Sequence, residues 1–431
     1  MIFYSLNNSA PKVSFKEAVV KGIAPDKGLY FPEKIEALPA SFFNDIETLS
    51  NQEIAFKAIH QFVGDEIPDN TLKEILDEVL DFDFPIVEIE ENVSTLELFH
   101  GPTMAFKDVG ARFMAHCMGY FSKTKQNEVT VLVATSGDTG GAVANGFLGV
   151  DGVKVVILYP SGKVSDIQEK QLTTLGQNIT AMEVDGTFDD CQKMVKTAFL
   201  DSDLTGKMQL TSANSINVAR WLPQLFYFLF AYKQTRSKGK EIIFSVPSGN
   251  FGNICAGMVA QKLGMPVKHF IASTNVNDVV PNYMIKGEYI PKPSKATISN
   301  AMDVGDPSNF IRIQHLYQND LERLLQNLSS YSFTDEETKN AMRHIYNASG
   351  YIADPHGAVG YLGLKKYQEN QSNTYGIFME TAHPVKFLDV VKDTLGITPA
   401  IPPQIQKVMG RKKKSITISS YDELKNYLKN H

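Results

Sequence analysis

The sequence predicts an α/β protein with parallel sheet structure, preceded by a mostly helical segment. Apolar strand-like runs alternate with helical stretches from about residue 128 onward, whereas residues 1–85 mostly show the helical spacing of apolar groups. Two of the strand-like runs are followed by a glycine-rich loop and then a helix. Strands that alternate with helices imply parallel pairing, because a parallel connection needs a crossover of helical length. At 431 residues, the chain has room for two or three domains.

Composition restricts the class of protein. Hydrophobic residues make up 43% and charged residues 21% of the chain, which excludes a disordered or collagen-like chain. The net charge of −6 argues against a surface that coats nucleic acid, and no apolar run approaches the ~20 residues that span a bilayer. The N-terminal residues lack a basic region followed by an apolar core, so we expect no signal peptide and a cytoplasmic protein. The three cysteines are widely spaced, which excludes a disulfide framework.

The N-terminal elements follow from apolar spacing and from capping residues. Apolar groups recur at helical spacing over residues 15–23, and Ser14 can cap that helix. Residues 24–28 carry a turn signal and precede the short apolar run 29–31. Further along, we expect two helices and then two strands, over residues 53–63, 70–80, 86–89 and 96–99.

The rest of the chain carries the alternating pattern. A strand-like run at 129–134 precedes a glycine-rich loop at 135–141, and a second run at 242–246 precedes another such loop at 247–253. Helices follow the two loops, over residues 142–148 and 254–263. Three further strands are expected, at residues 154–159, 267–272 and 375–379.

The two glycine-rich loops are candidates for anion sites. Each brings backbone N–H groups to a helix N-terminus, which attracts phosphate or carboxylate. Neither has the G-x-G-x-x-G pattern of a dinucleotide site or the G-K-[ST] of a P-loop, so nucleotide binding is disfavoured. One such loop alone would pass for a tight turn, but both also carry Ser, Thr, Asn or Asp, which favours anion binding.

Lys107 stands in an unusual context, directly after Met104-Ala105-Phe106 and a Gly-Pro turn. If these apolar groups bury the lysine, desolvation lowers its pKa and leaves a nucleophilic amine. Such a lysine can form a Schiff base with an aldehyde cofactor. The alternative is a lysine on a helix surface whose neighbours face the core.

Two further segments carry weaker signals. Thr381-Ala382-His383-Pro384 follows the strand at 375–379, and strand ends of open α/β sheets carry site groups. His383 alone is more often a hydrogen-bonded core histidine, and the nine histidines form no zinc motif. Residues 214–220 combine polar groups with Arg220, which suits either a second anion or a capped helix with a surface arginine.

Together these segments resemble the threonine synthase family, pyridoxal-phosphate enzymes of the tryptophan-synthase-β-like fold. The resemblance covers nearly the whole chain. Residues 15–30 resemble the family's N-terminal signature, and residues 100–108 resemble its cofactor-lysine motif. Residues 136–140 resemble its substrate-carboxylate loop, and residues 247–253 its cofactor-phosphate loop. Residues 381–384 resemble the segment beside the pyridine nitrogen. Lys27 stands where the family often has glycine, and Asp138 stands where the fold at large usually has asparagine. A carboxylate there would raise the electron density of the cofactor ring unless it were protonated or paired.

The resemblance implies two open-sheet lobes of the fold type II architecture with a mostly helical N-terminal extension. On this basis we expect an N-terminal helical domain at residues 1–85 and a smaller α/β lobe at 100–215. The larger α/β lobe would comprise residues 86–99 and 216–431. Both lobes would hold the cofactor.

The resemblance also implies an activity, namely the conversion of O-phospho-L-homoserine and water to L-threonine and phosphate by γ-elimination and β-hydration. Lys107 would hold pyridoxal 5'-phosphate as a Schiff base and, once released, act as the base. The other cofactor-binding residues would be Asp138, Gly249, Asn250, Phe251, Gly252, Asn253 and Thr381. The substrate carboxylate would be bound by Ser136, Gly137, Asp138 and Thr139. The substrate phosphate would be bound by Asn214, Ser215 and Arg220, with Lys163 as an outside candidate.

Other functions stay open on the sequence alone. A phospho-lyase that releases 2-oxobutyrate or a serine/threonine dehydratase could use the same scaffold, although the N-terminal signature and residues 214–220 favour threonine synthase. A binding protein that keeps a phosphate pocket would not need the amine of Lys107, and a nucleotide-binding scaffold lacks its usual motifs. We expect no nucleic-acid partner, no membrane partner and no metal, and a monomer or homodimer.

Overall fold

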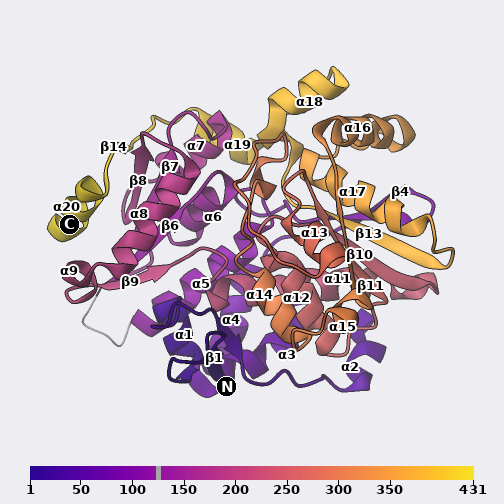
Figure 1. Cartoon of the computed structure of the whole chain (residues 1–431), viewed down its shortest axis with the longest axis horizontal. Coiled ribbons are helices and arrows are strands. Elements are labelled where there is room, and N and C mark those ends of the chain that lie inside the picture. Colours follow the sequence, from indigo (N-terminus) through magenta and orange to yellow (C-terminus); the bar gives the residue numbers. More distant parts are fainter. Residues whose placement is uncertain (123–127) are drawn as a thin grey trace.

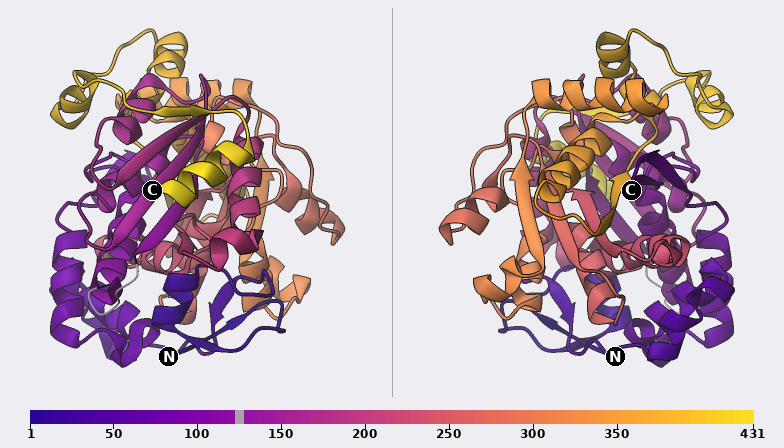
Figure 2. Two further views of the ribbon diagram at one scale, coloured as in Figure 1. Left: turned by 90° about the vertical axis from the view of Figure 1, so that its left-hand side faces the viewer. Right: turned by 90° about the vertical axis from the view of Figure 1, so that its right-hand side faces the viewer.

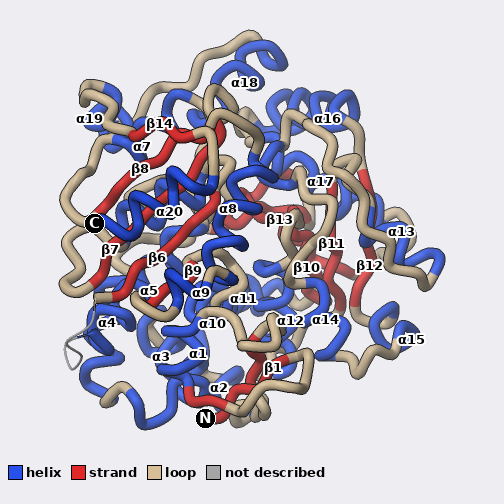
Figure 3. The backbone as a smooth tube through the Cα atoms, turned by 60° about the vertical axis from the view of Figure 1, so that its left-hand side comes forward, coloured by secondary structure: helices blue, strands red, loops and turns tan. Residues whose placement is uncertain are grey.

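The computed structural model describes residues 1–122 and 128–431 and has the α/β class that the sequence predicts. Its described strands form a three-stranded, a six-stranded and a five-stranded sheet. Figure 1 shows the two larger sheets beside each other, with the N-terminal segment beneath them, and Figure 3 shows their strands as two separate groups. None of the helices in the described ranges is long and apolar enough to cross a membrane.

The N-terminal segment contains the expected helices together with a small sheet that the sequence did not predict. The helices are α1 (Phe15–Lys21), α2 (Ala40–Asn44), α3 (Asn51–Val63) and α4 (Asp69–Val79). Ser14 caps α1 by accepting the Glu17 N–H while the Glu17 side chain accepts the Ser14 N–H, as in a capping box. The sheet has the antiparallel order β2-β1-β3, from β1 (Ile2–Ser5), β2 (Val13–Ser14) and β3 (Tyr30–Pro32).

The six-stranded sheet has the order β12-β11-β10-β13-β5-β4. Its strands are β4 (Ile86–Glu90), β5 (Val93–Glu97), β10 (Glu241–Pro247), β11 (His269–Thr274), β12 (Leu328–Ser332) and β13 (Thr374–Glu380). All neighbours are parallel except β4 and β5, which pair antiparallel. The predicted strands at 86–89, 242–246, 267–272 and 375–379 are confirmed within about two residues, and the one at 96–99 begins earlier, at Val93.

Alternate side chains of the six-stranded sheet pack on opposite layers of helices. Phe244 and Phe270 join a core with α11 (Leu225–Thr235) and α12 (Gly252–Lys262). Ile243 and Ile271 join a second core with α16 (Asp335–Ser349) and α17 (Pro355–Gln368). Because both faces are covered, the strands read as continuous apolar runs. The other helices of this half of the chain are α10 (Val218–Trp221), α13 (Val279–Lys286), α14 (Phe310–Leu316) and α15 (Leu321–Leu325).

The five-stranded sheet is parallel, in the order β14-β8-β7-β6-β9. Its strands are β6 (Val129–Ala134), β7 (Val153–Pro160), β8 (Ile179–Val184), β9 (Gln209–Ser212) and β14 (Ile416–Ile418). The helices around it are α5 (Lys107–Ser122), α6 (Asp138–Gly146), α7 (Asp166–Thr173), α8 (Phe188–Leu200) and α9 (Ser202–Thr205). The strands at 129–134 and 154–159 are therefore confirmed.

The C-terminal end of the chain corrects the expected domain organisation, which assigned all of residues 216–431 to the larger lobe. After α18 (Leu388–Leu395) and α19 (Pro403–Met409), strand β14 pairs with β8 of the five-stranded sheet. Helix α20 (Tyr421–Asn430) then packs against α8, as the yellow helix in Figure 2 (left) shows. The cause is hydrophobic, because buried Leu424 and Leu428 complete the apolar core on that side of the sheet.

Candidate active site

A cavity of about 340 Å³ lies between the two larger sheets and receives the predicted site residues. Its walls come from segments that follow strands β5, β6, β9, β10 and β13. The carboxyl ends of parallel strands meet at one edge of a sheet, which is where open α/β sheets bind ligands. The predicted residues on its walls are Lys107, Ser136, Gly137, Asp138, Thr139, Asn214, Ser215, Arg220, Gly249, Asn250, Phe251, Gly252, Asn253 and Thr381.

Lys163 is the exception among the candidates. It is exposed, in the turn after β7, and does not line the cavity. Its proposed contact with the substrate phosphate is therefore dropped. A larger hollow of about 760 Å³ lies near Lys154 and Tyr427, and none of the predicted site residues lines it.

Lys107 opens α5 and faces the cavity. The segment before it is tied to the segment after β13, because Phe106 N donates to Thr381 O at 2.8 Å and Ala105 bridges to Ala382. Burial lowers the pKa of the Lys107 amine, and the positive charges of Lys386 and Arg220 lower it further, whereas Asp138 opposes them. The amine is therefore buried at the cavity, where its neutral and more nucleophilic form is favoured.

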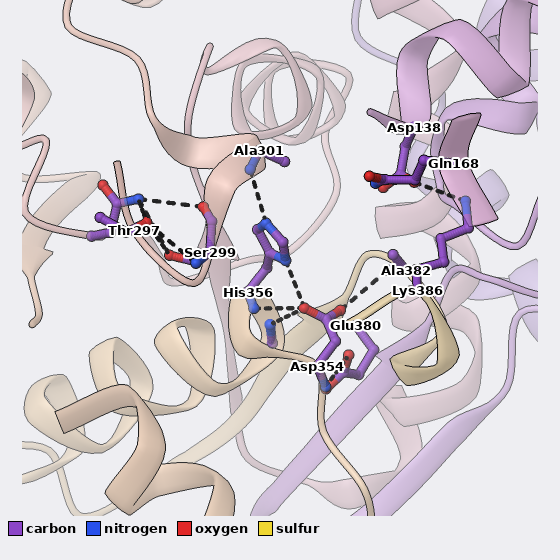
Figure 4. A network of polar contacts seen from close by, with 12 residues as sticks. Asp138, Gln168, Thr297, Ser299, Ala301, Asp354, His356, Glu380, Ala382 and Lys386 are labelled. Carbon is purple, nitrogen blue, oxygen red and sulfur yellow. Dashed lines mark hydrogen bonds and ion pairs between the residues drawn. The ribbon is translucent and has the colours of Figure 1, made fainter. Parts of the chain in front are cut away.

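Asp138, at the start of α6, is buried and forms an ion pair with Lys386. Lys386 Nζ lies 2.8 Å from Asp138 Oδ1, and Gln168 Nε2 donates to the same oxygen at 3.0 Å (Figure 4). Burial by itself raises the pKa of Asp138, but the charges of Lys386 and Lys107 outweigh it and bring the pKa to about 2. The carboxylate is thus ionised and paired, and Lys386 is a neighbour of the site that sequence reasoning missed.

The loop after β10 is a candidate anion site at the start of α12. Phe251 has a left-handed backbone with φ +60°, and α12 begins at the next residue. A side chain at Gly249 would place its Cβ 2.7 Å from Ala301 O, so only glycine allows this close approach of the two segments. Asn250 Nδ2 donates to Ser215 Oγ at 2.9 Å, and Asn253 Nδ2 to Pro247 O at 2.9 Å. The side chains thus fix the loop and leave the helix N-terminus to an anion.

Thr381 is buried and lines the cavity directly after β13. Behind it lies a network that the sequence did not predict, centred on Asp354 (Figure 4). Asp354 N donates to both oxygens of Glu380, at 3.1 and 3.2 Å, and Asp354 Oδ2 accepts from Ala382 N at 3.3 Å. Burial and the neighbouring Asp354 raise the pKa of Glu380 well above its usual range. Burial thus favours the neutral form of the Glu380 carboxyl group, and the network holds the Thr381 segment in place.

His356 extends this network to the segment around Ala301, which also lines the cavity. Its Nδ1 lies 2.7 Å from Asp354 Oδ1, and its Nε2 accepts from Ala301 N at 3.2 Å. Among the described residues, His356 is the histidine that lines the cavity, and His383 does not line it. His383 Nδ1 accepts from Val385 N at 3.1 Å, and burial lowers the pKa of His383 to about 4. The structure therefore favours the reading of His383 as a core histidine.

Arg220 is buried on α10 rather than exposed on a helix surface. One guanidinium nitrogen donates to Ala213 O, but Nε has no partner among the described residues. Burial lowers the pKa of Arg220 to about 10, which keeps the side chain charged at neutral pH. A buried, incompletely paired guanidinium beside a cavity is suited to bind an anion such as phosphate. Ser215 lies nearby and accepts from Asn250 and Asn309.

The chain matches three family models in succession. These describe the threonine synthase N terminus at residues 2–80, a pyridoxal-phosphate dependent enzyme at 91–376 and the threonine synthase C-terminal region at 357–428. The chain is 43% identical over 406 residues to the threonine synthase of Escherichia coli, covering 94% of each chain. It is 35% identical over 483 residues to the threonine synthase of Saccharomyces cerevisiae, covering 96% of this chain and 94% of the relative.

Solved structures agree with the sequence matches. The crystal structure of the Escherichia coli threonine synthase superposes with a TM-score of 0.93 at 41% identity and covers 100% of both chains. That of a pyridoxal-phosphate-bound threonine synthase from Brucella melitensis superposes with a TM-score of 0.92 at 33% identity, covering 100% of this chain and 99% of that one. With its sequence, its fold and the residues of its cavity in agreement, the chain belongs to the threonine synthase family of pyridoxal-phosphate-dependent enzymes.

Proposed function

We propose that this chain converts O-phospho-L-homoserine and water into L-threonine and phosphate. The observation that carries the proposal is the meeting, in one cavity, of a lysine amine of lowered pKa, a helix N-terminus for one phosphate and the buried Arg220 for another. Two phosphate sites suit a phosphorylated substrate beside a phosphorylated cofactor. A dehydratase that acts on serine or threonine needs only the first of them.

The cavity fits pyridoxal phosphate. The close approach at Gly249 and the left-handed Phe251 shape a cradle of backbone N–H groups, which suits the cofactor phosphate. The Thr381 hydroxyl is proposed to face the pyridine nitrogen, and the Lys107 amine to hold the cofactor aldehyde. When bound, the cofactor withdraws electrons from the substrate and makes its α and β C–H bonds acidic.

Lys107 is proposed as the group that moves protons. Its neutral amine can accept the proton from the substrate α carbon and, after turning toward the next atom, from the β carbon. Burial lowers the pKa of the amine and so favours the uncharged form that can act as a base.

The loop after β6 is proposed to bind the substrate carboxylate. Thr135 Oγ1 accepts from Gly137 N at 3.1 Å and from Gly140 N at 2.9 Å, which fixes the loop from within. The amides at the start of α6, at Asp138 and Thr139, point out of the helix end and can serve the carboxylate. A Cβ at Gly137 would lie 2.6 Å from Gln168 Nε2, so glycine here leaves room for the partner of Asp138.

Arg220, Asn214 and Ser215 are proposed to bind the substrate phosphate. The guanidinium charge stabilises phosphate as it leaves the γ carbon, which needs no proton from the protein. Because both lobes contribute walls, closing them around the substrate would exclude bulk water until the β carbon is ready for hydration.

Product analysis tests this function directly. Purified protein with pyridoxal phosphate and O-phospho-L-homoserine should yield threonine and phosphate in equal amounts. Lys107→Ala should abolish both products, whereas Lys163→Ala, an exposed lysine outside the cavity, should retain them. Phosphate together with 2-oxobutyrate would instead assign a phospho-lyase, and a protein that consumes no substrate would refute the proposal.

The cellular setting is proposed from composition alone. The net charge of −6 supports a protein without a nucleic-acid partner. We propose that it acts in the cytoplasm as a monomer or homodimer. Light scattering coupled to size-exclusion chromatography tests the oligomeric state.

A further inference from the structure

We propose that Lys386 is a positioning residue that occupies the carboxylate of Asp138 and so leaves the Lys107 amine free of a counterion. Lys386 Nζ lies 2.8 Å from Asp138 Oδ1, and the Lys386 side chain has no exposed surface (Figure 4). The two residues are 248 positions apart in the sequence. Because solvent does not reach the buried Lys386 amine, its charge is compensated only by the groups that it faces.

The ion pair joins the two lobes. Asp138 opens α6, beside the five-stranded sheet, whereas Lys386 lies on the short 3-10 helix η6 (Pro384–Phe387) that follows β13 of the six-stranded sheet. Gln168, on α7, holds the same carboxylate oxygen from within the smaller lobe. Asp138 is therefore fixed by one donor from each side of the cavity.

Lys386 and Lys107 compete for this carboxylate. Within residues 1–122 and 128–431, Lys107 forms no ion pair, whereas Lys386 does. If Lys386 were absent, Asp138 would be an unpaired buried carboxylate beside the Lys107 amine. The favourable outcome would then be a proton on Lys107, and a protonated amine is neither nucleophile nor base.

The other charged groups around Lys107 either lower the pKa of its amine as well or already have hydrogen-bond partners. Arg220, from α10, adds positive charge near Lys107. Asp108, the neighbour of Lys107 on α5, accepts from the backbone N–H and the hydroxyl of Thr103, and burial raises the pKa of Asp108. His383, which caps η6, is kept neutral by burial, which lowers the pKa of His383 to about 4. Asp138 is thus the carboxylate through which the Lys107 amine can be controlled.

The test rests on the proposed role of Lys107 and uses the protein with pyridoxal phosphate bound. The visible absorption of the lysine-bound cofactor is recorded against pH. Lys386→Met should raise the midpoint of the titration by about one unit, and Asp138→Asn should lower it by about one unit. Each shift is a tenfold change in the ratio of protonated to neutral form at a given pH. The double variant removes both charges, so its midpoint should equal that of the wild type. Lys386→Arg keeps the positive charge and should leave the midpoint unchanged.

Two controls separate charge control from folding. Lys413→Met removes a lysine that pairs with Glu169 and Glu183 away from the cavity, and should leave the midpoint unchanged. Each single variant leaves one buried charge unpaired, whereas the double variant removes both charges. If one single variant does not fold, the other decides alone, because Asp138→Asn must lower the midpoint and Lys386→Met must raise it. In the protein without cofactor, urea unfolding of the four members of the cycle should show coupling between the two side chains.

Opposite shifts in the two single variants are the result that a purely structural role would not produce. A midpoint that stays within about 0.3 units in both single variants, or that moves the same way in both, would overturn the inference. A wild type that shows no lysine-dependent absorption at all would refute the role of Lys107 and, with it, this proposal.

Discussion

Gly357, in the first turn of α17, leaves the space that the Glu380 carboxyl group occupies. A Cβ at this position would lie 2.1 Å from Glu380 Oε1 and 2.4 Å from its Cδ. Glu380 has no exposed surface, and both of its oxygens accept the Asp354 N–H. Gly357→Ala must therefore displace the carboxyl group from its bonds with Asp354.

The cost of this substitution combines three effects. Overpacking a buried site costs about 1–3 kcal/mol. The bifurcated hydrogen bond lost from the Asp354 N–H to the two Glu380 oxygens contributes about 1 kcal/mol. Alanine gains about 1 kcal/mol over glycine inside a helix, which offsets part of the loss. We expect Gly357→Ala to lower the free energy of unfolding by about 1–3 kcal/mol.

Gly360, one turn further along α17, supplies the matched control. A Cβ there would have its nearest neighbour, Pro247 Cδ, at 3.4 Å, which is an ordinary contact. Gly360→Ala should therefore equal the wild type or exceed its stability by up to about 1 kcal/mol. Urea unfolding of the three proteins without cofactor measures the difference. The reasoning would be refuted if Gly357→Ala unfolded at the same urea concentration as Gly360→Ala.

Three further outcomes are expected. Burial lowers the pKa of His269 to about 4 in the folded protein, so the unfolded chain binds more protons between about pH 4 and 6.5, and stability should fall as the pH drops through this window, by up to about 3 kcal/mol. His269→Gln should flatten that part of the stability profile, and an unchanged slope would contradict the assignment. Arg220→Gln should reduce kcat/KM for phosphate release by about 100-fold, and Arg220→Lys should give a value between that of Arg220→Gln and that of the wild type. If both variants were as active as the wild type, Arg220 would not belong to the site. Deleting residues 411–431 should lower the Tm and promote association, because it exposes the edge of β8 and the apolar core under α20, and a monomeric variant of unchanged Tm would argue against this.

Local features of the chain were predictable where one physical rule dominates. Ser14 and Gly64 mark helix ends through capping, and the apolar run 129–134 marks a strand buried on both faces. Lys107 was a candidate because it directly follows an apolar run, and Arg220 because it lies in a polar segment at the start of a helix. The structure brings both side chains to one cavity.

Features that depend on distant pairing were not predictable in the same way. Nothing near Lys386 indicates that it meets a carboxylate 248 positions away, since the spacing rules for helices and strands end within one element. Strand β14 is only three residues long, and its place at the edge of β8 depends on the apolar surface that α20 covers. The small N-terminal sheet was not predicted for a different reason, because its strands β1 and β2 are too short to show an alternating pattern.

The strand order of the six-stranded sheet has a consequence for how the protein is made. Strand β13 inserts between β10 and β5, so the hairpin of β4 and β5 joins the rest of its sheet only after residue 374 has been synthesised. Until then the nascent chain carries apolar strands without their partner, and pairing over such sequence separation is slow. Lys107 and Thr381 meet across this late junction. The two sides of the cavity therefore come together only in an almost complete chain, and we expect cofactor loading to follow synthesis.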